Sequence, residues 1–96
     1  MPAFTQITES TIVRRSSNHF TAEHEGATVI MSVEAGKFFT FDPIGFEIWE
    51  AFAISRKVAD VAEELAERHN APREVVAGDI TTFLARLADE ELLDFG

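Results

Sequence analysis

Residues 37–49 read Lys37-Phe38-Phe39-Thr40-Phe41-Asp42-Pro43-Ile44-Gly45-Phe46-Glu47-Ile48-Trp49. This order predicts a strand that leads directly into a helix. Lys37–Phe41 is rich in aromatic residues and contains neither Gly nor Pro, which is typical of strands. Asp42 fits the N-cap of a helix, and Pro43 suits the first helical position, where its missing N–H is not needed. The strand carries more aromatic surface than a half-exposed strand of a small domain usually does, so we expect part of it to serve a partner.

Strand patterns precede this junction and helical patterns follow it. Runs of β-branched and aromatic residues between turn residues predict strands, and a 3.6-residue apolar period predicts helices. The short connections favour an antiparallel meander for the strands. The expected elements are a loose arm at 1–8, strands at 11–15, 27–33 and 37–41, a continuation or second short strand at 19–23, helices at 43–53, 57–69 and 72–89, and an apolar tail at 92–95 docked on the core or the sheet.

Three strands followed by three helices predict one α+β domain over residues 1–96. The last two helices are joined by a short turn and have the outline of a helix-turn-helix beside a sheet, which is a winged-helix-like plan. Each helix shows one apolar stripe expected to face the core. The stripes are Ile44, Ile48, Trp49 and Phe52; then Val58, Val61, Ala62 and Leu65; then Val76, Ile80, Phe83, Leu84 and Leu87.

The composition excludes several classes of protein. The chain has 96 residues and no cysteine, so disulfides, cysteine zinc sites and thiol nucleophiles are not available to it. No apolar run approaches the roughly 18 residues that a membrane span needs, and the first residues lack the basic and apolar segments of an export signal. We therefore expect a cytoplasmic protein that has no contact with membranes.

Acidic residues dominate the second half of the chain. The net charge is −9, and residues 42–96 hold five Lys and Arg against thirteen Asp and Glu. The third predicted helix would be the one to enter a DNA groove, yet its region carries only Arg73 and Arg86 against five acidic residues. Because attraction to phosphates supplies most of the affinity for nucleic acid, we do not expect nucleic-acid binding.

The candidate catalytic residues do not form a known pattern. His19, His24 and His69 include no pair with the helical i, i+4 spacing of a zinc site. The serines lie in no nucleophile-elbow context, and there is no glycine-rich phosphate loop. We expect no metal, no cofactor and no enzymatic activity of this chain alone.

Recognition of a peptide fits the aromatic strand better. A strand at the edge of a sheet exposes unpaired backbone groups and usually needs protection, but Lys37–Phe41 has a single charge. Side chains alternate along a strand, so Phe39 and Phe41 are expected to face the core while Phe38 faces outward. An extended peptide is then expected to add as a further strand, with alternate side chains entering a pocket between this strand and the third helix.

The same residues resemble a known family. The segments 13–16, 29–39 and 41–50, together with the apolar pattern of the last two helices, are similar to the PqqD-like family over nearly everything from residue 11 onward. The most specific part is the strand, Asp-Pro and helix sequence that ends in Ile48-Trp49-Glu50. Within the family, the chain is most similar to the free-standing PqqD-like proteins of lasso-peptide biosynthesis.

The resemblance implies a precursor-peptide recognition element with a small winged helix-turn-helix fold. It implies that the leader of a ribosomally made precursor adds to the strand Lys37–Phe41, and that the protein presents the precursor to a partner enzyme, a leader-removing cysteine protease in lasso systems. By position, the helical wall of the site is Val76, Asp79, Ile80, Phe83 and Arg86. Asp79 and Arg86 are the polar candidates for contacts to the leader.

Two departures from the family pattern and two rival functions accompany this interpretation. Phe41 stands where the family more often has leucine, and Lys57 occupies the usual cap position of the second helix. One alternative is a peptide chaperone for a radical enzyme, as in quinone-cofactor biosynthesis. The other is a winged-helix transcription regulator, against which the acidic charge argues.

Overall fold

The computed structural model describes residues 7–17, 19–25, 27–33 and 36–95. Most of the expected N-terminal arm lies outside these residues, whereas Ile7 packs against the core and Thr8 bonds to Thr11. The elements in chain order are β1 (Ile12–Arg15), β2 (His19–His24), β3 (Ala27–Ser32), β4 (Lys37–Phe41), α1 (Pro43–Ala51), β5 (Arg56–Lys57), α2 (Val58–His69), α3 (Arg73–Asp89) and β6 (Leu93–Phe95).

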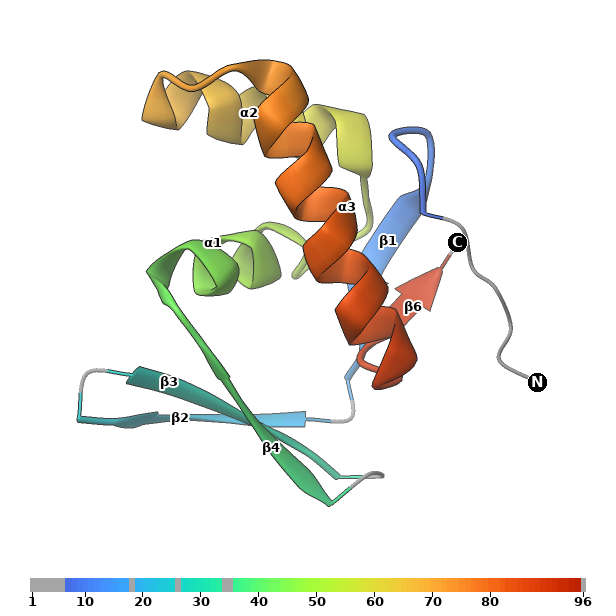
Figure 1. The fold of residues 1–96 in the computed structure, drawn as a ribbon. Coiled ribbons are helices and arrows are strands. Elements are labelled where there is room, and N and C mark those ends of the chain that lie inside the picture. Colours follow the sequence, from blue (N-terminus) through green and yellow to red (C-terminus); the bar gives the residue numbers. More distant parts are fainter. Residues whose placement is uncertain (1–6, 18, 26, 34–35, 96) are drawn as a thin grey trace.

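The strands form two antiparallel sheets instead of the one that we expected. β2, β3 and β4 make a three-stranded meander, with Met31 opposite both Phe20 and Phe38. β1 is not part of it and pairs with β5 and with the C-terminal β6. The prediction failed here because it paired consecutive strands only. The apolar tail also needs a partner, and it finds one in β1 (Figure 1).

The three predicted helices are present, and their ends differ from the expected ones by one or two residues. The Asp42 carboxylate accepts a hydrogen bond of 2.6 Å from the Gly45 N–H, and Pro43 opens α1, as the sequence predicts. Lys57 holds the N-cap position of α2 without a side-chain cap bond. α2 ends at Asn70 in the left-handed conformation, which Asn tolerates better than most residues.

The hydrophobic core lies between the helices and the two sheets. Trp49 of α1, Phe52 directly after α1 and Leu92 of the tail are among its largest fully buried members. The expected stripes of α2 and α3 face this core, with Val76 and Phe83 partly buried at its border. Ile44 is an exception in α1: it lies in the first turn and is 54% exposed, so its place in the predicted stripe is wrong.

The helices all lie on one side of the β2–β3–β4 sheet (Figure 1). β4 runs straight into α1, and the lower end of α3 lies on the same side of the sheet as α1. The other face of this sheet is covered by none of the described elements. Within the described part of the chain, no helix combines the length and apolar character needed to cross a bilayer.

Candidate functional site

β4 is an edge strand of its sheet. Among the described residues it pairs with β3 alone, from Lys37 opposite Ser32 to Phe41 opposite Thr28. Backbone N–H and C=O groups of a strand point alternately to its two sides. Half of the backbone groups of β4 therefore point away from β3, toward the side on which a further strand can add.

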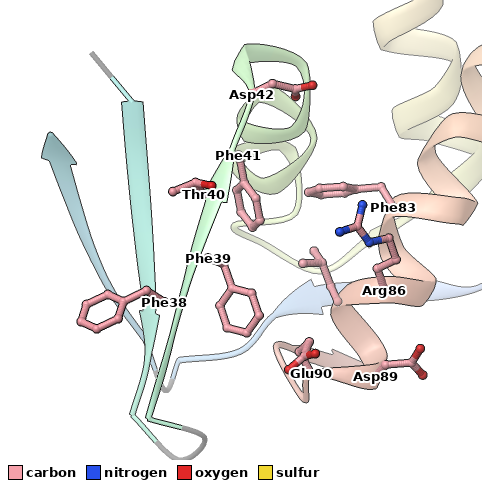
Figure 2. Close-up of a pocket in the computed structure, with 10 residues that line it drawn as sticks. Phe38, Phe39, Thr40, Phe41, Asp42, Phe83, Arg86, Asp89 and Glu90 are labelled. Carbon is pink, nitrogen blue, oxygen red and sulfur yellow. The ribbon is translucent and has the colours of Figure 1, made fainter. Parts of the chain in front are cut away.

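The side chains of β4 alternate as the sequence predicts. Phe39 and Phe41 are partly buried and pack against the core, whereas Phe38 is 70% exposed. Figure 2 shows the rings of Phe39 and Phe41 on the side of α3, and the Phe38 ring and Thr40 on the opposite side of the strand.

A cavity of about 550 Å³ opens between β4 and the last turns of α3 (Figure 2). We call this cavity the groove. Its volume lies within the range of pockets that bind organic ligands or side chains. The residues that line it are Phe38, Phe39, Thr40, Phe41, Asp42, Phe83, Arg86, Leu87, Asp89 and Glu90.

The floor of the groove is aromatic and firmly anchored. The Phe41 ring lies edge-on to Phe83, with 5.2 Å between centroids, and its centroid is 5.6 Å from that of Trp49. Gly45 fits closely against this packing, because a Cβ there would lie 3.1 Å from the Phe83 Cε1 atom and the ring would have to shift by a few tenths of an ångström. Aromatic pairs in such geometry add about 0.5–1.5 kcal/mol beyond burial of their area. The floor is therefore preformed.

Charged side chains surround this apolar floor. Lys37 bonds to Glu90 at 3.3 Å and so connects β4 with the end of α3. The Asp42 carboxylate is occupied by the cap of α1. Arg86 and Asp89 have no ion-pair partner among the described residues, and Figure 2 shows the Arg86 guanidinium beside Phe83 at the groove. Of the described residues, one unpaired cation and one unpaired carboxylate therefore border the site.

The structure brings together only part of the predicted site. Phe38, Phe39, Thr40, Phe41, Phe83 and Arg86 line the groove, although the side chains of Phe38 and Thr40 point to the opposite side of β4, and Lys37 reaches it through Glu90. The other three lie further up α3: Ile80 is fully buried in the core, Val76 is partly buried and Asp79 is exposed. None of these three lines the groove.

Four lining residues were missed as site residues: Asp42, Leu87, Asp89 and Glu90. Phe83, Leu87 and Glu90 follow one helical row at i, i+4 and i+7, so a signal for two of them existed. The prediction extended this row toward the N-terminus of α3. The groove lies at the C-terminal end, because that is the part of α3 that faces β4.

A second hollow of about 760 Å³ lies beside α1 and α2, but its charged side chains are all in ion pairs, Glu50 with Arg15 from outside the hollow. Glu47 accepts from Arg68 at 2.6 Å and contacts His69, and Glu64 accepts from Arg56 and Arg68. Burial raises the pKa of Glu47, but the bonds and charges of Arg68 and His69 outweigh it and hold that pKa below its usual value of 4.5. This hollow offers no free charged group for a ligand among the described residues.

Metal-ligating side chains do not cluster among the described residues. These residues contain no group of three or more His, Asp or Glu placed to hold a metal ion. His19 bonds to the Ser16 carbonyl through Nδ1 at 2.7 Å and packs edge-on against Trp49. What the groove offers is an open backbone edge, an apolar floor and two free charges, which together suit an extended peptide.

Comparisons with known proteins match this chain to a family and to a shared fold. The sequence profile described as "Coenzyme PQQ synthesis protein D (PqqD)" matches residues 27–93. Among the curated proteins that were compared, none matches this chain significantly.

Three solved structures share the fold. The PqqD part of Methylobacterium extorquens PqqCD, described as a stand-alone RiPP recognition element, has a TM-score of 0.78 at 21% identity and covers 94% of this chain and 96% of its own. TbiB1 in complex with the TbiA(beta) leader peptide has a TM-score of 0.74 at 23% identity, covering 84% and 94%. Lasso peptide synthetase B1 complexed with its leader peptide has a TM-score of 0.74 at 17% identity, covering 85% and 96%.

Proposed function

This chain belongs to the PqqD family, and on that premise we propose that it binds the leader segment of a ribosomally synthesised precursor peptide of the lasso type. The leader adds to β4 as a further antiparallel or parallel strand. The whole chain acts as one winged-helix-like binding domain and performs no chemistry itself.

The observation that carries this proposal is the position of a free strand edge beside a preformed apolar groove. The edge offers main-chain hydrogen bonds, which any extended peptide can make. The groove then selects among peptides, because it takes the side chains on one side of the added strand. Two proteins of this fold are described as complexes with leader peptides, which supports the same use of the fold here.

The expected affinity follows from a few contacts. Each main-chain hydrogen bond contributes about 1 kcal/mol net. An apolar side chain of the leader that is buried on Phe39, Phe41 and Phe83 adds roughly 2 kcal/mol. After the cost of association, the expected dissociation constant lies in the micromolar range or somewhat below.

We assign the contacts with the leader to Lys37–Phe41, Phe83 and Arg86. Phe83 forms part of the floor, and the Arg86 guanidinium donates hydrogen bonds to a carboxylate of the leader. Val76, Asp79 and Ile80 lie beyond the groove, so Val76 and Asp79 contact only a leader that continues along α3, and Ile80 acts through the core.

The proposed task of the complex is to present the precursor to a maturation enzyme. In a lasso system this enzyme is a leader-removing cysteine protease. The alternative is a radical enzyme, as in quinone-cofactor biosynthesis, which the family name favours. Co-purification of the tagged protein with proteins encoded by neighbouring genes separates the two. A protease that co-purifies supports the first, and an iron–sulfur enzyme that co-purifies supports the alternative.

The test of binding is a titration of a fluorescein-labelled synthetic leader, taken from the precursor gene nearest to this one, followed by fluorescence anisotropy. Saturable binding is expected. Arg86→Glu should weaken it by about three- to tenfold, since the free cation at the groove becomes an anion.

Lys57→Glu is the matched control for Arg86→Glu. It makes the same change of charge at an exposed residue that does not line the groove, so affinity should stay within about twofold of the wild type. Absence of saturable binding by the wild type would refute the proposed function.

A further inference from the structure

The face of the β2–β3–β4 sheet that is turned away from the helices is uncharged in its centre. The register aligns Phe20, Met31 and Phe38 in one cross-strand row and Ala22, Val29 and Thr40 in the next row on the same face. Phe20 is 64% exposed and Phe38 is 70% exposed. We call these six residues the outer face.

Such a face needs an explanation, because antiparallel sheets usually turn polar residues toward water on the side away from the core. None of the described elements covers it (Figure 1). Its two Phe side chains are among the most exposed large apolar side chains of the described residues. Contiguous exposed apolar surface of this kind often marks a binding site.

A peptide strand added to β4 meets this face as well as the groove. Side chains of a strand alternate between its two sides, so a leader that sends one set into the groove sends the other set to the side of Phe38 and Thr40. Directly opposed residues on neighbouring strands have Cβ atoms about 4.5–5.5 Å apart, close enough for side-chain contact. The outer face is thus continuous with the proposed binding edge.

We infer that Phe38 and Thr40 form a second subsite, which takes an outward-pointing apolar side chain of the same bound peptide strand. This inference rests on the proposed function and specifies its ligand. The leader then carries two apolar anchors an odd number of residues apart, one in the groove and one extending the row of Phe20, Met31 and Phe38. A leader that is read by the groove alone would need apolar residues only at even spacing.

Phe20 makes it possible to distinguish a bound peptide strand from a larger partner that covers the whole outer face. This residue lies on the same face and is exposed to nearly the same degree, but it is on β2, two strand spacings or roughly 10 Å from β4. A second copy of the chain or a maturation enzyme that covers the whole face would contact Phe20 as well as Phe38. A strand added at β4 contacts Phe38 only.

The experiment compares Phe38→Thr with Phe20→Thr, because threonine is compatible with a strand and removes the ring. The probe is the labelled synthetic leader, and circular dichroism verifies that both variants fold. Phe38→Thr should weaken binding by about three- to fivefold, and Phe20→Thr should leave it within about twofold. Against a leader in which the outward apolar residue is replaced by Ser, Phe38→Thr should have no further effect.

Three outcomes would overturn the inference. If the wild type binds and neither variant changes affinity, the outer face is not a subsite, although the proposed function stands. If both variants weaken binding equally, the whole face is covered by something other than the added strand. If the wild type does not bind the leader at all, the proposed function fails together with the inference.

Discussion

At the scale of single residues, Phe41 joins the groove to the core. Its ring contacts Trp49, which is buried, on one side and Phe83, which lines the groove, on the other. Gly45 lies behind this pair, where a Cβ would approach both Phe83 and the Asp42 carboxylate to 3.1 Å. The identity of residue 45 therefore determines how far Phe83 extends into the groove.

Gly45→Ala should weaken leader binding by about three- to tenfold while it changes the free energy of unfolding by less than about 1 kcal/mol. Alanine favours the helix by about 1 kcal/mol, but its methyl group is expected to push the Phe83 ring toward the groove, which this ring lines. Leader titration and urea denaturation measure the two effects.

Gly78→Ala is the control for this prediction. Residue 78 lies on α3, and a Cβ there meets no atom within 4 Å. This variant should be more stable than the wild type by about 1 kcal/mol and should bind the leader normally. Equal binding by both variants would contradict the view that Gly45 positions Phe83.

At the scale of elements, an ionic network joins α1 to α2. Burial works against ionisation of Glu47, yet Arg68 and His69 lower its pKa overall. A hydrogen bond from Arg56 is the main cause of the lowered pKa of Glu64, which also bonds to Arg68. Both carboxylates are thus stabilised in their charged form by folding.

A carboxylate whose pKa is lower in the folded than in the unfolded state stabilises the fold above its unfolded pKa, and this contribution is lost as the pH falls through the folded pKa. The urea midpoint should therefore drop as the pH is lowered below about 4.5. Glu47→Gln should lower the midpoint at pH 7 and make its fall below pH 4.5 less steep.

Glu67→Gln is the matched control, since Glu67 is exposed on α2 and has no ion pair among the described residues. Its urea midpoint should follow that of the wild type at every pH. An equal change in both variants would show that overall charge, and not the network around Glu47, determines the acid sensitivity.

The elements also show where sequence reasoning succeeds. The turn from β4 into α1 was predictable because its signals are local: a cap, a proline and alternating aromatic residues within ten positions. The pairing of β1 with β6 was not, because it joins residues about eighty positions apart and no local pattern specifies it. The strand side of the groove was predictable because its signals are local. The position of the groove along α3 was not, because it depends on contacts between residues that are far apart in the sequence.

At the scale of the whole molecule, strands near the two ends of the described chain pair with each other. β1 pairs with β6, and the Ser16 N–H donates to the Leu92 carbonyl at 2.8 Å. Leu92 is fully buried. A domain of this size has only about 5–15 kcal/mol of net stability. The contacts of the tail are therefore expected to contribute a large share of the free energy of unfolding.

Leu92→Ala should lower the free energy of unfolding by about 2–5 kcal/mol, the usual cost of truncating a buried leucine. Ile54→Ala removes a side chain that is 67% exposed and should change it by less than about 0.5 kcal/mol. Urea denaturation followed by circular dichroism compares the two. A cost below about 1 kcal/mol for Leu92→Ala would mean that the tail is not part of the core.

The distribution of charge agrees with a peptide partner and not with nucleic acid. The net charge is −9, and the described surface of α3 at the groove adds Asp89 and Glu90 to Arg86. An acidic surface of this kind repels phosphate backbones. It does not hinder an extended peptide, whose affinity comes from main-chain bonds and apolar anchors.

Amide hydrogen exchange of β4 tests the central claim most directly, because strand addition must protect the backbone groups that now face solvent. With saturating leader peptide, exchange of Lys37–Phe41 should slow markedly, whereas exchange at β2, the other edge of the sheet, should stay the same. Saturable binding of the leader with unchanged exchange at β4 would contradict strand addition at this edge.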